Sequence, residues 1–137
     1  MSRRVRSQRD LEPFGATILI IEDEALVASY IGTVLAESGY RVAGIAACGP
    51  EAVSLADAHR PHLALVDIRL AGRTDGVELA CRLRREFGVP SIFLSGAADA
   101  ETIERAQATQ PLGFLKKPFL PSQVFNAIER ALAGRVP

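Results

Sequence analysis

The stretch "TILIIEDEALVASYIGTVLAESG", residues 17–39, decides the fold because it contains one complete strand–helix unit. Residues 17–21 are a short, continuous apolar run rich in β-branched side chains, which is typical of a strand buried on both faces. In the residues that follow, apolar side chains recur at the spacing of one helix face: Val27, Ile31, Val34 and Leu35. Gly39 is suited to end that helix. The stretch therefore indicates a parallel α/β sheet.

The same alternation continues to the end of the chain. Further strands are predicted over residues 40–47, 62–67, 91–95 and 112–117. Further helices are predicted over about residues 50–59, 76–87, 98–109 and 121–133. The helix over 98–109 is the weakest, with only Ile103 and Ala106 as clear inward residues. Five strand–helix units predict an α/β fold, with a doubly wound parallel sheet of five strands covered by helices on both faces.

The size and composition of the chain indicate one globular domain. It has 137 residues, 48% of them hydrophobic, which is enough to build a core. Residues 1–14 are polar, basic and without periodicity, so we expect a flexible tail there and a single domain over residues 15–137. The formal net charge is zero, which argues against nucleic acid or an anionic membrane as the main partner.

The chain also carries hints about its location. No apolar run approaches the roughly 20 residues that a transmembrane helix needs, and no apolar segment follows the N-terminal arginines as in a secretory leader. Cys48 and Cys81 are isolated and lack a CxxC spacing, so we expect two buried, free thiols. These observations predict a cytoplasmic protein in a reducing compartment.

Charged and hydroxyl residues follow four of the five predicted strands. In a parallel sheet of this kind, function lies at the carboxyl ends of the strands. The residues that stand there are Glu22, Asp23 and Glu24 after the first strand, Asp67 after the third, Ser95 and Gly96 after the fourth, and Lys116, Lys117 and Pro118 after the fifth. The second strand ends in Ala46, Ala47 and Cys48, which offer no obvious chemistry. Glu24 alone is best interpreted as a helix cap or a solvated residue.

The chemistry of this set favours a magnesium site and phosphoryl transfer. Carboxylates brought together at one edge repel one another, and a divalent cation relieves that repulsion. Two or three carboxylates with carbonyl and water ligands suit Mg²⁺. A carboxylate can also act as a nucleophile toward phosphorus, and Mg²⁺ and a lysine ammonium would neutralise the charge of the transferred group.

At this point the sequence resembles a known family, the receiver domains of two-component response regulators with the CheY-like fold. The resemblance covers about residues 16–134 and rests on four segments in order: "ILIIEDE", "LALVDIRLAGRTDG", "SIFLSGAAD" and "GFLKKPF". It implies a flavodoxin-like (βα)5 fold with strand order 2-1-3-4-5. It also implies a stand-alone bacterial phosphoprotein that works in a phosphorelay and is not a turnover enzyme.

The resemblance assigns a role to each site residue. Asp67 would be the phosphoacceptor, with Ser95 and Lys117 contacting the phosphoryl group. Asp23 would bind Mg²⁺ directly and Glu22 directly or through water. Asp67 itself and the backbone carbonyl of Arg69 would complete the protein ligands. Ser95 would also act in a switch, together with an aromatic residue at position 114.

The implied partners are a histidine kinase or a histidine phosphotransfer protein, and a downstream protein. A homodimer could form through the face made by residues 98–109, 112–117 and 121–133. Some residues depart from the family pattern: Phe114 lacks a hydroxyl, and Arg69 and Ala97 occupy places where the family tunes dephosphorylation. Arg69 would either lean over the phosphate, which predicts a longer-lived phosphoryl group, or point to solvent.

Three alternatives remain beside the phosphorylated switch. A receiver-like docking or dimerisation module would use the same fold without phosphorylation. A phosphatase with an aspartate nucleophile, similar to haloacid dehalogenases, would want a second acid where this chain has Arg69. A nucleotide or flavin binder would need a glycine-rich loop after the first strand, and this chain has "EDEALV" there.

Periodicity cannot decide which of two adjacent lysines reaches the site. Alternation places Phe114 and Lys116 on one face of the last strand and Leu115 and Lys117 on the other. In the family the functional lysine directly precedes the proline, which implies Lys117 and leaves Lys116 in solvent. The resemblance further implies a cis peptide bond between Lys117 and Pro118, an isomer that is accessible because the bond precedes proline.

Overall fold

The computed structural model describes residues 15–70 and 75–133, and these residues form one five-stranded parallel sheet. The strands are β1 (Thr17–Ile21), β2 (Arg41–Ala46), β3 (Leu63–Asp67), β4 (Ser91–Ser95) and β5 (Gly113–Lys116). They lie in the order β2-β1-β3-β4-β5, and each neighbouring pair is parallel. The predicted α/β class and strand order are confirmed.

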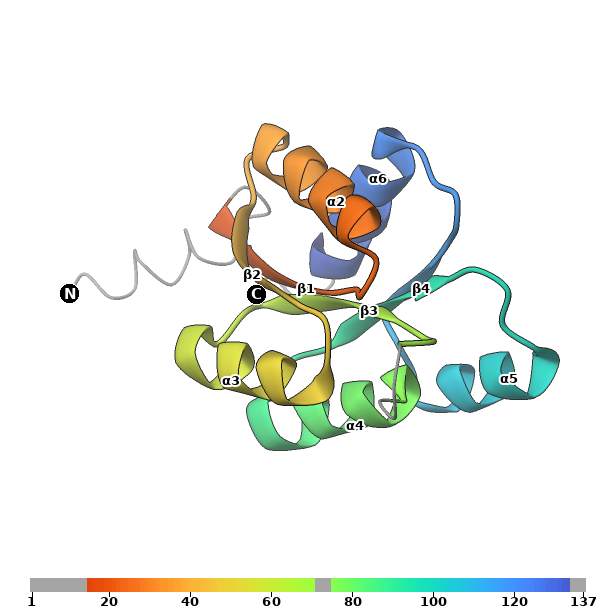
Figure 1. Cartoon of the computed structure of the whole chain (residues 1–137). Coiled ribbons are helices and arrows are strands. Elements are labelled where there is room, and N and C mark those ends of the chain that lie inside the picture. Colours follow the sequence, from red (N-terminus) through yellow and green to blue (C-terminus); the bar gives the residue numbers. More distant parts are fainter. Residues whose placement is uncertain (1–14, 71–74, 134–137) are drawn as a thin grey trace.

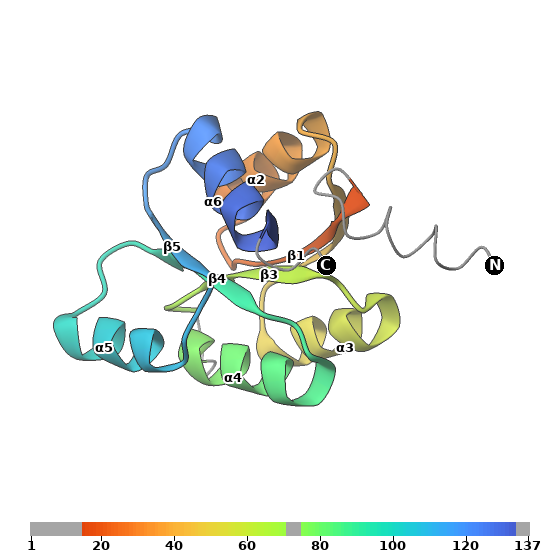
Figure 2. The ribbon, with the colours of Figure 1, turned by 180° about the vertical axis from the view of Figure 1, so that it is seen from behind.

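Helices cover both faces of the sheet. They are α2 (Ala25–Glu37), α3 (Gly49–His59), α4 (Gly76–Phe87), α5 (Ala100–Ala108) and α6 (Pro121–Ala133). Figures 1 and 2 show α2 and α6 on one face and α3, α4 and α5 on the other. In residues 15–70 and 75–133, no helix combines the length and the apolar character that a membrane crossing requires.

Each face has its own apolar core, and the sequence pattern explains both. All five residues of β3 are buried, as expected of a central strand covered on both sides. On one side, the apolar stripe of α2 packs with α6 against alternate residues of β1; on the other, the intervening residues pack against α3 and α4. The two cores therefore pack against the strands whose carboxyl ends carry the site residues.

The weakest predicted helix departs most from its prediction. The helix α5 spans Ala100–Ala108 instead of residues 98–109, and Ile103 is only half-buried, so that Ala106 is its one buried residue. A helix that buries one alanine gains little from the core, and its ends depend on local contacts. The cysteine prediction was partly wrong: Cys48 and Cys81 are free thiols, but both are half-buried instead of buried. The predicted tail, residues 1–14, lies outside the described residues.

Candidate functional site

Three acids meet where β1 and β3 end. These strands are neighbours with Ile21 opposite Val66, so Glu22 and Asp67 come side by side at the edge of the sheet. Glu22 is 1% exposed and Asp67 is 5% exposed. One ligand atom from each of Glu22, Asp23 and Asp67 lies within 4.8 Å of the others. The sheet thus brings together the three acids that the sequence analysis singled out as metal ligands.

A single lysine joins this acidic cluster. Lys117 Nζ lies 2.8 Å from Glu22 Oε1, 3.2 Å from Asp67 Oδ2 and 3.3 Å from Glu24 Oε1. Lys116 is exposed, so of the two adjacent lysines it is Lys117 that reaches the acids. The peptide bond between Lys117 and Pro118 is cis, which confirms the prediction drawn from the family resemblance.

Burial and the neighbouring charges act in opposite directions at this cluster, and the pKa values of Glu22 and Lys117 are both raised. Burial raises the pKa of Glu22, and the contacts with Lys117 and the Glu24 N–H offset this only in part. For Lys117, burial lowers the pKa, but the hydrogen bonds and charges of Glu22 and Asp67 outweigh burial and leave the pKa well above its usual range. The lysine therefore stays charged at neutral pH, and it compensates several carboxylates at once.

Arg69, two residues beyond Asp67, contacts the Asp67 carboxylate through its backbone. The Arg69 N–H donates to Asp67 Oδ1 at 3.0 Å, which fixes the orientation of the carboxylate. The Arg69 side chain extends to the loop after β4, where Nη1 donates to the Ala97 carbonyl at 3.1 Å. The arginine thus connects Asp67 and the segment after β4 while its side chain remains exposed, and whether it leans over a phosphoryl group stays a prediction.

The two residues of the predicted switch lie on different parts of β4 and β5. Ser95 is the last residue of β4, and its carbonyl accepts from the Lys117 N–H at 2.7 Å, so Ser95 and the lysine share one edge. Phe114 is 37% exposed, and its ring centroid is 5.7 Å from that of the buried Phe93. Phe93 belongs to the core beneath α3, α4 and α5, so Phe114 faces that side of the sheet.

Glu24 has a contact that the sequence analysis missed. It occupies the N-cap position of α2 as expected, but its side chain makes no capping hydrogen bond. Instead its carboxylate contacts Lys117, while the side chain remains 65% exposed. The only signal in the sequence was a third acid directly after the acid pair, and the partner lies 93 residues further along the chain.

The donor set fits a hard divalent cation. Carboxylates offer only oxygen ligands, which is what Mg²⁺ prefers. Glu22 Oε1 is buried and accepts no hydrogen bond of good geometry from the described residues, although Lys117 lies close to it as an ion pair. A buried carboxylate oxygen whose close contact is an ammonium group, and which lies beside two further acids, is suited to coordinate a metal.

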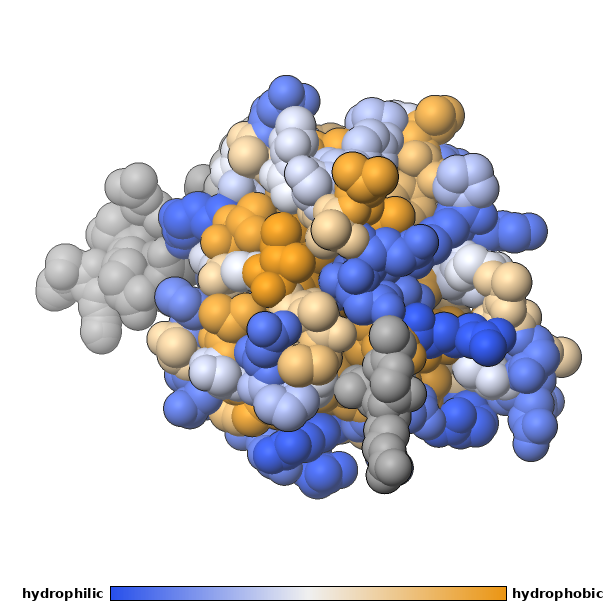
Figure 3. Space-filling view, viewed as in Figure 1, coloured by the Kyte–Doolittle hydropathy of each residue, from blue (hydrophilic) through white to orange (hydrophobic). Residues whose placement is uncertain are grey.

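The cluster opens to the surface of the molecule. A groove of about 580 Å³ runs from Glu22 and Asp23 along small residues of α2, which are Ala25, Ala28, Ser29, Gly32, Thr33 and Ala36. Figure 3 shows hydrophilic residues gathered near the middle of the view, where β1 turns into α2 in Figure 1, with apolar residues beside them. The groove therefore gives solvent and small ligands a way to Asp23 and to the edge of Glu22.

Comparisons with known proteins agree with this geometry. Residues 18–129 match the family model of the response regulator receiver domain. The transcriptional regulatory protein PdtaR of Mycobacterium tuberculosis is 35% identical over 116 residues, which are 85% of this chain and 56% of that protein. The phyllosphere-induced regulator PhyR of Methylorubrum extorquens is 37% identical over 116 residues, 84% of this chain and 43% of that protein. The chain thus spans about half the length of these relatives.

Solved structures show the same fold. The signal receiver domain of a modulated diguanylate cyclase from Desulfovibrio desulfuricans G20 is 40% identical with a TM-score of 0.83, covering 88% of this chain and 95% of that one. A CheY-like response regulator receiver domain protein from Methanospirillum hungatei JF-1 is 26% identical with a TM-score of 0.80, again covering 88% of this chain and 95% of that one.

Proposed function

The chain belongs to the response regulator receiver family of two-component signalling, and from this premise we propose that Asp67 accepts a phosphoryl group from a histidine kinase or a histidine phosphotransfer protein. The observation that carries the proposal is the contact of Lys117 with both Asp67 and Glu22. This contact brings the proposed nucleophile Asp67, the neighbouring acid Glu22 and the ammonium group of Lys117 together at one edge of the sheet. The proposed receiver unit spans residues 15–137.

Mg²⁺ is the proposed cofactor. Asp23 would bind it directly, Glu22 directly or through water, and Asp67 and the Arg69 carbonyl would complete the protein ligands. Bound there, Mg²⁺ would supply positive charge against the phosphoryl oxygens. The proximity of the Glu22, Asp23 and Asp67 oxygens supports this assignment.

The transfer itself would be a displacement at phosphorus. A carboxylate oxygen of Asp67 forms the new bond to phosphorus, while the bond between phosphorus and the donor's imidazole nitrogen breaks and that nitrogen keeps the electron pair. The Arg69 N–H, 3.0 Å from Asp67 Oδ1, holds the carboxylate in place during the attack. Lys117 then exchanges its contact with Asp67 for one with the phosphoryl oxygens, and the Ser95 hydroxyl donates to another of them.

The phosphoryl group would change partner binding through the side of the sheet that carries Phe114. Ser95 moving toward the phosphate would leave room for Phe114, which is now partly exposed, to turn inward against Phe93. Because Phe114 has no hydroxyl, this movement is a change in packing alone. The surface formed by α5, β5 and α6 would then bind a downstream protein or a second copy of the chain.

Incubation with Mg²⁺ and acetyl phosphate tests the proposed function. We expect intact-mass spectrometry to show one added phosphoryl group, and we expect this addition to be lost in Asp67→Ala and when EDTA removes the metal. Lys116→Ala is a matched control because that side chain is exposed and should leave the reaction unchanged. If no small donor or phosphorylated phosphotransfer protein modifies the chain, the docking or dimerisation module becomes the better interpretation.

A further inference from the structure

The helix α5 is held to its neighbour α4 mainly by polar contacts. Of its nine residues only Ala106 is buried, so apolar packing does little to fix the position of the helix. Two arginines instead connect the two helices, one at each end. Arg84 of α4 reaches the residues after α5, and Arg105 of α5 reaches the residue before α4. The position of α5 therefore depends on these two connections.

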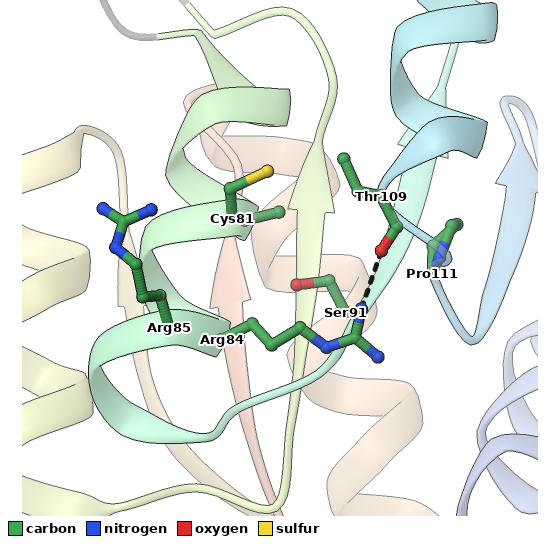
Figure 4. Close-up of a pocket in the computed structure, with 7 residues that line it drawn as sticks. Cys81, Arg84, Arg85, Ser91, Thr109 and Pro111 are labelled. Carbon is green, nitrogen blue, oxygen red and sulfur yellow. Dashed lines mark hydrogen bonds between the residues drawn. The ribbon is translucent and has the colours of Figure 1, made fainter.

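The connection through Arg84 lies at the end of the sheet remote from the acids. Its Nη1 donates to the Thr109 carbonyl at 2.7 Å and to the Gln110 carbonyl at 3.3 Å. Figure 4 shows the guanidinium extending from α4 across to Thr109, beside Ser91 and Pro111. A hollow of about 180 Å³ lies at this place, lined by residues of α4 and of the segment after α5, so the two helices are not closely packed there.

The connection through Arg105 lies at the end near the acids. Its Nη2 is 2.7 Å from Asp75 Oδ2, and Asp75 Oδ1 accepts from the Val77 N–H at 2.9 Å, which caps α4. Burial raises the pKa of Asp75, but the hydrogen bonds from Arg105, Glu78 and Val77 outweigh it and leave the pKa below its ordinary value. One carboxylate thus serves both as the cap of α4 and as the anchor of α5.

Asp75 is also part of the structure that supports Asp67. Its backbone pairs with that of Arg69 in an isolated antiparallel β-bridge. The Arg69 N–H in turn orients the Asp67 carboxylate. The next residue, Gly76, lies so close to the backbone of Asp67 that a Cβ atom there would be 2.0 Å from the Asp67 carbonyl oxygen. The Gly76 N–H donates to the Ile68 carbonyl at 3.2 Å. A displacement of Asp75 would therefore be transmitted directly to the backbone of the proposed phosphoacceptor.

We propose that Arg105 is a positioning residue for the Asp67 site: its ion pair with Asp75 holds the backbone pairing of Asp75 with Arg69 in place and couples the position of α5 to the state of Asp67. This inference rests on the proposed function. It differs from the switch through Ser95 and Phe114 because the connection runs over the outside of the molecule, through two charged side chains. The coupling free energy is reciprocal. If the position of α5 changes the free energy of phosphorylation, phosphorylation of Asp67 must change the equilibrium position of α5 by the same free energy.

The test compares the two arginines. The full chain and its variants are phosphorylated with Mg²⁺ and acetyl phosphate, the rate is followed by intact mass, and amide hydrogen exchange is measured over residues 100–108. We expect Arg105→Gln to slow phosphorylation about two- to five-fold, the range that a partly exposed ion pair supports. Arg84→Gln is the matched control: it should also increase exchange in α5 but, because the pair between Arg105 and Asp75 remains, it should slow phosphorylation less than Arg105→Gln does.

Asp75→Asn separates the ion pair from the helix cap, because asparagine still caps a helix. We expect it to slow phosphorylation as much as Arg105→Gln does, and the double variant to be no slower than either. The inference is overturned if Arg105→Gln leaves the rate unchanged, if Arg84→Gln slows it equally, or if the two effects add. Failure of the wild type itself to become phosphorylated would refute the proposed function instead.

Discussion

Replacement of Lys117 by glutamine is the substitution whose effect on stability follows most directly from the contacts in the site. The ammonium lies within 3.3 Å of oxygens from Glu22, Glu24 and Asp67, and the variant removes this charge from all three. Glu22 and Asp67 are buried, and in the metal-free protein the described residues would then offer them no lysine or arginine within ion-pair distance. We therefore expect Lys117→Gln to be strongly destabilised when no metal is present.

The size of the effect follows from the burial of the partners. Removing one member of a buried ion pair costs about 3–5 kcal/mol, because the other charge is left uncompensated. The Lys117 side chain is 17% exposed and water reaches Glu24, so the lower end of that range, about 3 kcal/mol, is appropriate. For a chain of this size that corresponds to a fall in Tm of roughly 10 °C.

The change in the free energy of unfolding is measured by urea titration followed by circular dichroism. Each protein is measured once with EDTA and once with saturating Mg²⁺. We expect Mg²⁺ to stabilise Lys117→Gln more than the wild type, because the metal takes over the compensation of the acids. Lys116→Gln should change the free energy of unfolding by less than about 0.5 kcal/mol, since Lys116 is exposed. The reasoning fails if Lys117→Gln equals the wild type in EDTA, or if Mg²⁺ stabilises both proteins equally.

Three further predictions concern the loop after β3. Gly76→Ala should lower the free energy of unfolding by about 3 kcal/mol, because its Cβ would lie 2.0 Å from the Asp67 carbonyl oxygen, whereas Gly96→Ala, whose nearest neighbour is 3.7 Å away, should be nearly neutral in the same urea titration. Arg69→Asn should hydrolyse the Asp67 phosphoryl group several-fold faster, because the arginine reaches across to the Ala97 carbonyl beside the site; an unchanged rate, timed by intact mass after removal of the donor, would show that the arginine does not shield it. Asp75 has a pKa below its ordinary 3.8, so its ionised form stabilises the fold above that pH and the gain is lost as the pH falls through the lower folded value; Asp75→Asn should be less stable by under ~1 kcal/mol at neutral pH, and a difference that does not shrink as the pH is lowered below 3.8 would contradict the assignment.

The fold was predictable from local patterns because its three central strands, β1, β3 and β4, are short, apolar and largely buried. The run Thr17–Ile21 and the fully buried β3 could hardly belong to anything other than a central parallel sheet. The acids at the ends of these strands were predictable for the same reason, since the carboxyl ends of neighbouring parallel strands meet at one edge. The bounds of α5 were less accurate because that helix buries only Ala106 and so leaves a weak apolar pattern.

Long-range polar contacts were not predictable from local patterns. The ion pair between Glu24 and Lys117 joins residues 93 positions apart, and the pair between Asp75 and Arg105 joins residues 30 positions apart. No local periodicity records such pairs, because both members are surface residues by spacing alone. The alternation of β5 likewise did not decide between Lys116 and Lys117; the family resemblance did, and the structure brings Lys117 to the acids.

The assignment of the phosphoacceptor is tested most directly by locating the modified residue. The chain is incubated with Mg²⁺ and acetyl phosphate, the acyl phosphate is reduced with borohydride to preserve its position, and the peptides are sequenced by tandem mass spectrometry. We predict that the modification lies on Asp67 alone and requires Mg²⁺. Modification of Glu22 or Asp23 instead, or of Asp67 at the same rate in EDTA, would contradict the account of the site.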